Sequence, residues 1–318
     1  MTPTQLRAFA AVVRLGSVKR AAAELNVSES AVSLHVGQLR KELNDKLFLR
    51  TASGLAFTPG GLRLASRAAE MLGLQDRTIL EVSQAGGGRR LLRVGASSLF
   101  GEYCAPGLIE LFAGRAADLD VELSIHPSRE FGRLLMTRAI DVAIGPQPAD
   151  LDEAIVARTF LNYQVVVVAA PDHPMAQVQA GVGELRDQTW LLGPSAAADI
   201  GLMPVILRRL MVPEDKQQIF QSHSAALDEA RRGRGLALAV SFSVAQDIAN
   251  GRLVRLPGSG LHTEGAWTTM VLATQGAVSA AAELVRFATT PRATQAMLRG
   301  SGVNVGRFRP SIHVTLWS

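Results

Sequence analysis

The chain has 318 residues, of which 33 are Lys or Arg, 28 are Asp or Glu and one is cysteine, and its formal net charge at pH 7 is +5. This length allows two or three domains. It lacks the run of about 18 apolar residues that a transmembrane helix needs, so no membrane partner is expected. The first residues form an amphipathic helix pattern in place of a basic-then-apolar export signal, and we therefore expect a cytoplasmic protein.

The single thiol, Cys104, excludes an intrachain disulfide and a cysteine-cluster metal site. We expect it to be a small buried side chain on a helix. A redox-sensing role is the alternative, although a resolving partner thiol is absent.

Three short helices are predicted at the start of the chain. Thr2 to Gln5 reads as a capping box with proline at the first helical position. Ser17 can cap a helix over residues 18–25, and Ser28 can cap a third one. The first helix carries an apolar stripe at helical spacing, formed by Leu6, Phe9, Ala10 and Val13.

The helix that follows Ser28 has two different sides. One side is an apolar stripe facing a core, formed by Val32, Val36, Leu39 and Leu43. The opposite side is short or polar and carries Glu29, Ser30, Ser33, Leu34 and Gly37. A helix with such a side can enter the major groove of DNA, so this segment predicts DNA recognition.

A polar, glycine-containing tip over residues 50–54 follows and is predicted to be the wing of a winged helix-turn-helix. The apolar residues that complete its core are expected to be Leu47, Phe48, Leu55 and Phe57. On the turn spacing alone, a small helical bundle without a nucleic-acid role remains the alternative.

The charge distribution favours a polyanion partner. Residues 1–90 hold 13 Lys and Arg and 7 Asp and Glu, a net +6, whereas the other 228 residues hold 20 and 21, a net −1. Because the whole positive excess lies in the first quarter of the chain, it predicts a DNA-binding domain there. The candidates for phosphate contact are Arg14, Lys19, Arg20, Arg40, Lys41, Lys46 and Arg50.

A long helix is predicted from Thr58-Pro59 to about Ala85. Its apolar seam is narrow, which suits pairing with another helix, although packing against its own domain is an alternative. The seam residues are Leu62, Ala65, Ala69, Leu72, Ile79 and Ser83. Gly86–Gly88 then forms a flexible hinge, which lacks the GK[ST] ending of a phosphate-binding loop.

From residue 91 onward, strand patterns alternate with helix patterns, which predicts an α/β fold with a parallel-rich sheet. The predicted strands are 91–96, 121–125, 141–145, 164–168, 190–192, 236–240 and 268–273. Helices are predicted from the first strand to about Gly114, over 130–138 and over 277–289. Two such lobes joined by crossing strands would form a cleft whose ligand lies at the carboxyl ends of the strands.

The first sixty residues resemble the N-terminal domain of LysR-type transcriptional regulators. The resemblance rests on Leu6, Phe9, Gly16-Ser17, Ala21-Ala22, Leu25 to Ser28, Ala31 to Ser33, Leu39, Leu43, Leu47-Phe48, Arg50-Thr51 and Thr58 to Gly61. The family usually has glutamine and proline where Glu29 and Ser30 stand here, arginine where His35 stands, glutamate where Arg40 stands and glycine where Asn44 stands. We expect the DNA-binding role to survive these changes, whereas the preferred base sequence does not follow from the resemblance. Glu29, for example, can accept a hydrogen bond from cytosine N4.

The resemblance extends more loosely over the α/β part, through residues 141–145, 171–176, 233–237 and 251–254. It implies an N-terminal winged helix-turn-helix over 1–58 and a linker (dimerisation) helix with hinge over 59–88. It also implies a two-lobed, periplasmic-binding-protein-like effector domain, with subdomain I over 89–163 and 268–318 and subdomain II over 164–267. In the family the linker helices pair antiparallel, so we expect a homodimer, and a homotetramer through the outer strands of the lobes.

The expected function is regulation of transcription, in which a small-molecule effector bound between the lobes modulates promoter binding or DNA bending. The residues expected to contact DNA are Ser28, Glu29, Ser30, Ser33, Leu34, His35, Gly37, Gln38, Lys41, Lys19, Arg20, Arg50 and Thr51. By analogy with the family, the effector would contact Ser97, Ser98, Ser128, Pro194, Ser195, Ser222 and His223. These hydroxyls and the loop N–H groups suit a small anion such as a carboxylate.

Two other functions are compatible with the α/β part alone. A solute-binding protein without a transcriptional role would share the two lobes, but the winged domain argues against it. An α/β hydrolase would need a Gly-x-Ser-x-Gly elbow, which is missing, and His173 between Asp172 and Pro174 has the composition of a turn. We therefore expect no catalytic residue and no cofactor, and His126, His223 and His262 lack metal-ligand spacing.

Overall fold

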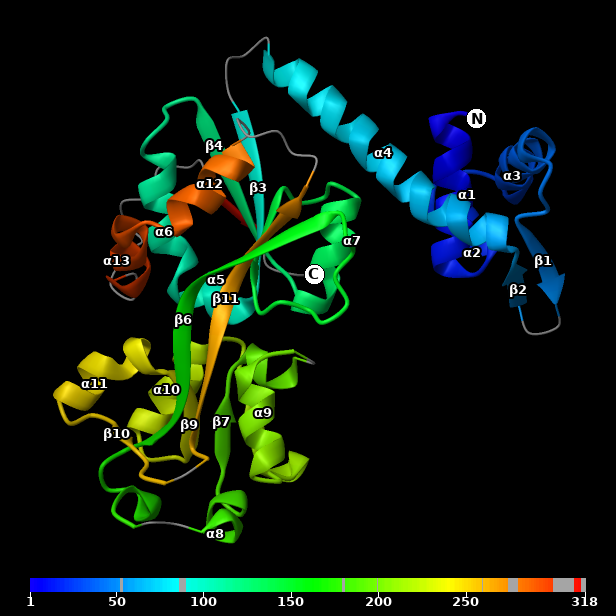
Figure 1. Ribbon diagram of the computed structural model, residues 1–318. Coiled ribbons are helices and arrows are strands. Elements are labelled where there is room, and N and C mark those ends of the chain that lie inside the picture. Colours follow the sequence, from blue (N-terminus) through cyan, green and yellow to red (C-terminus); the bar gives the residue numbers. More distant parts are fainter. Residues whose placement is uncertain are drawn as a thin grey trace. The chain divides into compact units, whose positions relative to one another are not determined.

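The structure is a computed structural model that describes residues 1–51, 54–85, 90–178, 181–198, 200–258, 260–273, 280–299 and 312–315. Two compact units make up the chain, one formed by Met1–Gly88 with Met136–Ala139 and the other by Arg89–Leu135 with Ile140–Ser318. Figure 1 shows the course of the chain through both.

The first unit holds the predicted winged helix-turn-helix. Its elements are α1 (Pro3–Leu15), α2 (Val18–Glu24), α3 (Glu29–Leu43), β1 (Phe48–Thr51), β2 (Gly54–Phe57) and α4 (Pro59–Ala85). The predicted helix starts are confirmed. Thr2 and Gln5 form the capping box, and the hydroxyls of Ser17 and Ser28 accept the N–H groups of Arg20 and Ala31. The antiparallel pair of β1 and β2 is the wing.

The core of the first unit lies between α1, α2, α3 and β1. Its most buried side chains include Phe9, Val12, Val32, Leu39 and Leu47, each at most 1% exposed. The prediction for Leu43 is wrong, because this residue is 41% exposed. It ends α3 immediately before left-handed Asn44, past the point where Leu47 and Phe48 close the core.

The buried side of α1 also differs in part from the predicted stripe. Leu6 and Phe9 are buried as expected, but Val12 and not Val13 completes the stripe. Val13 packs against the core while partly exposed, and Ala10 is likewise only partly buried. The buried stripe of α1 therefore follows Leu6, Phe9 and Val12, at i, i+3 and i+6, and does not reach Val13 at i+7. The reason is that α2 also packs against α1.

The long helix α4 begins where the sequence predicts. The Thr58 hydroxyl accepts the N–H of Gly61 at 2.9 Å and so caps its first turn. Leu64 and Ala65 pack against the core of the first unit. Other apolar side chains of this helix are exposed, namely Leu62, Met71, Leu74, Ile79 and Val82. The Ser83 side chain and the predicted hinge Gly86–Gly88 lie outside the described residues.

The second unit is built on one sheet of ten strands. The strands are β3 (Arg90–Ala96), β4 (Leu119–Ile125), β5 (Val142–Gly145), β6 (Ile155–Ala169), β7 (Trp190–Leu192), β8 (Gln217–Ile219), β9 (Leu236–Val240), β10 (Val254–Arg255), β11 (His262–Leu272) and β12 (Ile312–Thr315). Their order is β12-β4-β3-β5-β11-β6-β9-β7-β8, and β10 pairs with β6. All seven predicted strands are present, and β6 and β11 are much longer than predicted.

Helices flank the sheet of this unit. They are α5 (Ser98–Tyr103), α6 (Ala105–Ala113), α7 (Phe131–Met136), α8 (Val182–Arg186), α9 (Leu202–Arg209), α10 (His223–Arg231), α11 (Ala245–Ala249), α12 (Ala280–Ala288) and α13 (Pro291–Arg299). The single helix predicted up to Gly114 is two helices, α5 and α6, which meet at Cys104. Pro106 explains the break, because its ring would clash with the carbonyl four residues earlier in a continuous helix.

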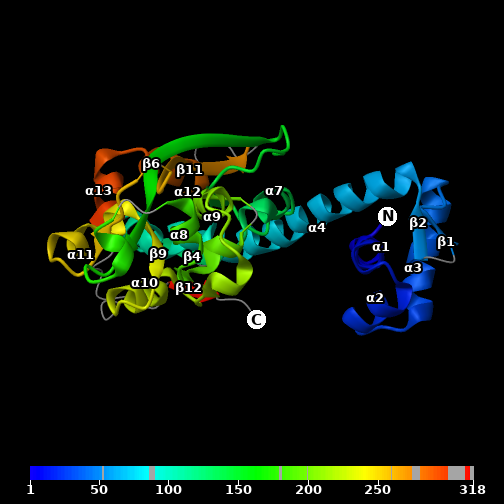
Figure 2. The ribbon, with the colours of Figure 1, turned by 90° about the horizontal axis from the view of Figure 1, so that it is seen from below.

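The long strands β6 and β11 run side by side and antiparallel in the middle of the sheet, as both views show (Figures 1 and 2). They connect two lobes, one with β3, β4, β5 and β12 and the other with β7, β8, β9 and β10. At one end β11 pairs with β5 through Thr268–Met270. At the other end β6 pairs with β9 through Val165–Val168. A register shift between Trp267 and Thr268 marks the change from one lobe to the other.

Replacement of Leu39 by alanine should lower the stability of the first unit by about 2–5 kcal/mol, because it leaves a cavity in the core. Leu34, which is 60% exposed on the same helix, is the matched control and should cost about 0.5 kcal/mol or less. Hydrogen exchange of the α1 and α3 amides in the full chain measures both. Equal effects would contradict the assigned orientation of α3.

Candidate functional site

The outward side of α3 carries the residues that the sequence assigned to DNA. Ser30, Ser33, Leu34 and Gly37 are exposed, whereas Val32 and Val36 on the other side are at most 3% exposed. Nothing lies within 4 Å of a Cβ built on Gly37, so the surface there is open. This side of α3 can therefore approach the base edges of a DNA groove without moving the core.

The start of α3 is ordered by its own side chains. The Ser28 hydroxyl accepts the N–H of Ala31 at 3.1 Å and lies 2.8 Å from the hydroxyl of Ser30. Glu29 is exposed in the first turn, where a carboxylate is favourable to the helix dipole. Further along, His35 is half-buried, and Gln38 accepts a hydrogen bond from Gln5 at 2.9 Å. Gln38 is thus held by α1.

The basic side chains of the first unit differ in the partners they have within it. The exposed Arg20 donates to the Leu15 carbonyl at 3.4 Å, and Arg14 is 60% exposed although it is paired. Lys19, Arg20 and Lys41 are exposed. In contrast, the Arg40 guanidinium donates to the Phe48 carbonyl at 2.8 Å and lies 4.4 Å from the centre of that ring, so it anchors the wing. Arg14 forms an ion pair with Glu24. These two are the least suited of the predicted phosphate contacts.

Asp45 fixes the wing relative to α4. One oxygen of its carboxylate accepts the N–H of Leu47 at 2.6 Å and the hydroxyl of Thr58 at 2.7 Å. These hydrogen bonds lower the pKa of Asp45. In the wing itself, the Thr51 hydroxyl donates to the Gly54 carbonyl at 3.1 Å. The Arg50 side chain, predicted to contact DNA, lies outside the described part of the chain.

The predicted effector residues of subdomain I lie together at the carboxyl ends of β3 and β4. The Ser97 N–H donates to the Ile144 carbonyl, and the His126 N–H donates to the Ala96 carbonyl, both at 2.9 Å. Ser97 and Ser128 are 8% and 6% exposed. Within the described part of the chain the Ser97 hydroxyl has no hydrogen-bond partner. A buried hydroxyl of this kind is suited to a ligand atom.

The predicted residues of subdomain II lie at the carboxyl ends of β7 and β8. These strands are parallel, and the Phe220 N–H donates to the Leu192 carbonyl at 2.8 Å just beyond them. Pro194 and Ser195 are half-buried in the short helix that follows β7. The Ser222 hydroxyl accepts the N–H of Ala225 at 3.1 Å and caps α10. His223, at 2% exposed, is the first residue of that helix.

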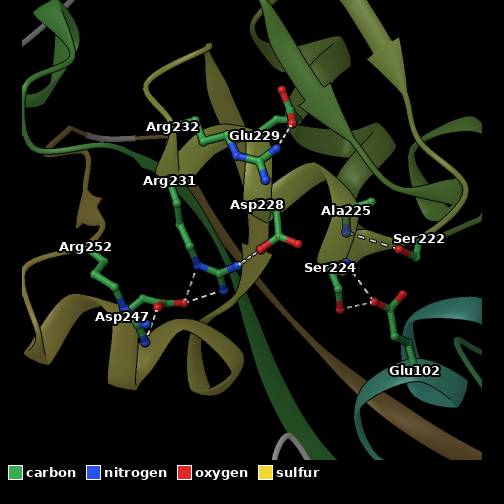
Figure 3. A network of polar contacts seen from close by, with 10 residues as sticks. All are labelled: Glu102, Ser222, Ser224, Ala225, Asp228, Glu229, Arg231, Arg232, Asp247 and Arg252. Carbon is green, nitrogen blue, oxygen red and sulfur yellow. Dashed lines mark hydrogen bonds and ion pairs between the residues drawn. The ribbon is translucent and has the colours of Figure 1, made fainter.

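Two contacts join these strand ends across the lobes. The hydroxyls of Ser98 and Ser195 are 2.8 Å apart, so two predicted effector residues 97 positions apart in sequence touch directly. Beside them, Glu102 of α5 reaches the first residues of α10 (Figure 3). Glu102 is not among the effector residues expected from the sequence. Its only signal was a carboxylate one helical turn after Ser98, on the same side of α5.

Glu102 is held by four hydrogen bonds. One oxygen accepts the N–H of His223 at 2.9 Å and lies 2.7 Å from its Nδ1, while the other accepts the N–H and the hydroxyl of Ser224 at 2.7 and 2.5 Å. Burial alone would raise the pKa of Glu102, but the contacts with His223 and Ser224 prevail and lower it to about 2. The carboxylate is therefore ionised at neutral pH.

The other end of α10 is anchored by a second polar network (Figure 3). Asp247 of α11 is 4% exposed and pairs with Arg231 at 2.6 Å and with Arg252 at 2.8 Å. Arg231 also pairs with Asp228 one turn earlier. A buried carboxylate held by two guanidinium groups fixes the helix end, because removing one partner would leave a buried charge uncompensated.

Other residues named by the sequence have structural roles. His173 Nδ1 accepts the N–H of Met175 at 3.2 Å, which closes the turn expected there. Cys104 is fully buried, and burial raises the pKa of its thiol, so the reactive thiolate is disfavoured.

Two open surface hollows, of about 830 and 660 Å³, lie along α13 and between α6 and α13, away from the predicted effector residues. A search of the described ranges finds no group of three acidic, histidine or cysteine side chains that could hold a metal ion.

No helix in the described portion of the chain combines the length and apolar character needed to cross a membrane.

Replacing Glu102 with glutamine should flatten the acid limb of the stability curve. The folded-state pKa of Glu102 lies below its ordinary value, so its contribution is present above about pH 4.5 and is lost as the pH falls toward about 2. Melting temperatures across this range, with exposed Glu110 changed to glutamine as the control, test this. Parallel curves for the wild type and the Glu102 variant would contradict the assigned contacts.

Known proteins share both parts of this architecture. Residues 3–62 match the family described as bacterial regulatory helix-turn-helix protein, lysR family, and residues 85–290 match the LysR substrate binding domain. An uncharacterized HTH-type transcriptional regulator of Mycobacterium tuberculosis is 56% identical over the whole of both chains. The RuBisCO operon transcriptional regulator of Allochromatium vinosum is 27% identical over 83% of this chain and 87% of its own.

Among solved structures, ArgP from Mycobacterium tuberculosis matches with a TM-score of 0.59 and 20% identity, over 90% of this chain and 97% of its own. An OxyR mutant from Corynebacterium glutamicum matches with a TM-score of 0.53 and 21% identity, over 94% of this chain and 95% of its own. These likenesses concern the fold. The two family matches and the 56% identical relative show that the chain belongs to the LysR family of transcriptional regulators, which bind DNA and small-molecule effectors, oligomerise and are not enzymes.

Proposed function

We propose that this regulator reads its operator with the outward side of α3 and that an effector between the two lobes modulates this binding. The observation that carries the proposal is the two-sided burial of α3, which places a polar, open surface on the most basic part of the chain. Base contacts are assigned to Glu29, Ser30, Ser33, Leu34 and Gly37, with Ser28, His35 and Gln38 beside them. Backbone contacts are assigned to Lys19, Arg20, Lys41, Arg50 and Thr51.

The effector is proposed to be a small anion, such as a carboxylate. Its anionic group would meet Ser97, Ser98 and Ser128 at the ends of β3 and β4, because the Ser97 hydroxyl is buried and lacks a partner among the described residues. Pro194, Ser195, Ser222 and His223 would line the opposite lobe. Ligand binding across both lobes can shift DNA binding only through its different affinity for the two arrangements.

We further propose a homodimer through α4 and a homotetramer through the lobes. The exposed apolar side chains of α4, including Leu74, Ile79 and Val82, support a helix partner. The boundary between the two effector subdomains proposed from the sequence is supported by the register shift at Trp267/Thr268, where the pairing of β11 with β5 also begins. A cytoplasmic location fits a protein whose partner is promoter DNA.

The DNA-reading surface is tested with substitutions at two places on the exposed side of α3, one expected to contact bases and one expected to contact phosphates. Changing Ser33 and Leu34 to alanine should weaken binding to the operator by roughly 1–3 kcal/mol for each lost base contact. Lys41→Ala should instead weaken binding to all sequences alike and lower the salt dependence. Gel shifts with a fragment beside the protein's own gene and with a scrambled fragment separate the two effects. Unchanged discrimination in the Ser33 and Leu34 variants would contradict the proposal.

The effector site is tested by filling the space beside Ser98. Ser98→Trp removes the contact with Ser195 and should abolish any thermal stabilisation by small carboxylates while DNA affinity persists. A panel of dicarboxylates and hydroxycarboxylates serves as the probe, and Glu214→Trp, at an exposed position of the same unit, is the control. A normal response in the Ser98 variant would show that the effector binds elsewhere.

A further inference from the structure

The start of α10 is already occupied by a carboxylate from another part of the chain. Glu102, 121 residues earlier on α5, accepts the N–H groups of both His223 and Ser224, the first two residues of α10, at 2.9 and 2.7 Å. The Ser222 hydroxyl accepts the third N–H, that of Ala225, at 3.1 Å. Three amides that helix geometry leaves without an intrahelical acceptor are therefore satisfied.

This arrangement has the chemistry of an anion-binding site. The N–H groups at a helix start converge and carry partial positive charge, so they favour a carboxylate or phosphate. Here the helix has nine residues, and the side chains of His223 and Ser224 add two further contacts to the same carboxylate. Figure 3 shows Glu102 directed at Ser224 beside the capping pair of Ser222 and Ala225.

The His223 ring is locked in place for this contact. A Cβ built on Gly193 would lie 2.3 Å from the ring Cδ2, so only glycine leaves space for the imidazole. An ionised carboxylate can only accept, and Nδ1 must therefore be the donor toward Glu102. The other nitrogen, Nε2, is buried without a partner in the part of the chain that is described. Through Nδ1 the ring contacts Glu102, and the ring lies against that of Tyr103 at a centroid distance of 6.0 Å.

We infer that the α10 N-terminus is an anion site that the protein fills with its own carboxylate. Glu102 thereby excludes free anions from this end of subdomain II and ties α5 to α10 across the lobes. The anionic group of an effector would therefore bind beside Ser97, Ser98 and Ser128, and not at the start of α10. Only this last consequence rests on the proposed function.

The test vacates the site and offers it an external carboxylate. In Glu102→Ala, the His223 and Ser224 amides should exchange hydrogen about 10- to 100-fold faster than in the wild type. Acetate should restore much of the protection, whereas sodium chloride at the same ionic strength should not. Residue-resolved hydrogen exchange of the full-length protein, without DNA or effector, provides the readout, and acetate should leave the wild type unchanged.

Two further variants make the result decisive. Glu102→Gln fills the same space without a charge, so its His223 and Ser224 amides should also exchange faster, but acetate should have no effect. Glu110→Ala removes an exposed carboxylate from the neighbouring α6 and should behave like the wild type. Wild-type protection in both Glu102 variants, no gain in the protection of Glu102→Ala on addition of acetate, or an equal gain in Glu102→Gln would overturn the inference. Because neither DNA nor effector is present, such a failure is separate from a failure of the proposed function.

Discussion

The burial of one side of α3 is the constraint on which the proposed recognition of DNA depends. Val32, Val36 and Leu39 are at most 3% exposed, so α3 cannot rotate about its axis without taking them out of the core. The opposite side chains are consequently presented to solvent in a fixed order. Arg40 and Asp45 extend this rigidity to the wing, through the Phe48 carbonyl and the Leu47 N–H. A preorganised surface of this kind loses little conformational entropy when it binds.

A different constraint governs the second unit. Among the strands of the described residues, only β6 and β11 run through both lobes, and the strand ends that meet between the lobes belong to segments distant in sequence. The contacts of Ser98 with Ser195 and of Glu102 with α10 hold these ends together. A ligand that binds between the lobes therefore competes with, or adds to, these contacts of Ser98 and Glu102, which already favour one arrangement of the two lobes. Its effect on DNA binding is the difference between its affinities for the two states.

Local patterns explain which features of the molecule were predictable. Caps at Thr2, Ser17 and Ser28 and the apolar spacing of α3 are short-range signals, and the structure confirms them. Leu43 continues the same spacing but is exposed. This residue could not be predicted correctly, because periodicity alone does not show where a core ends. The family resemblance supplied the order of domains and the expectation that serines of both lobes face one cleft, which no local pattern contains.

Glu102 shows why the rest could not be predicted. Its role depends on α10, which begins 121 residues later, and on the glycine at 193 that leaves room for His223. Likewise, Arg40 looked like a phosphate ligand until its contact with the Phe48 carbonyl and ring was visible. Charge and residue type indicate what a side chain can bind, but the fold determines which partner lies within contact distance.

A site-specific photocrosslink measures the proposed position of α3 on DNA most directly. A benzophenone amino acid at Ser33 of the full-length protein, irradiated with its operator fragment, should crosslink to bases in the major groove. The same amino acid at exposed Ala23 on α2 should give little or no crosslinking to bases. Crosslinks to bases from Ala23 and none from Ser33 would contradict the assignment of α3 as the helix that reads the operator.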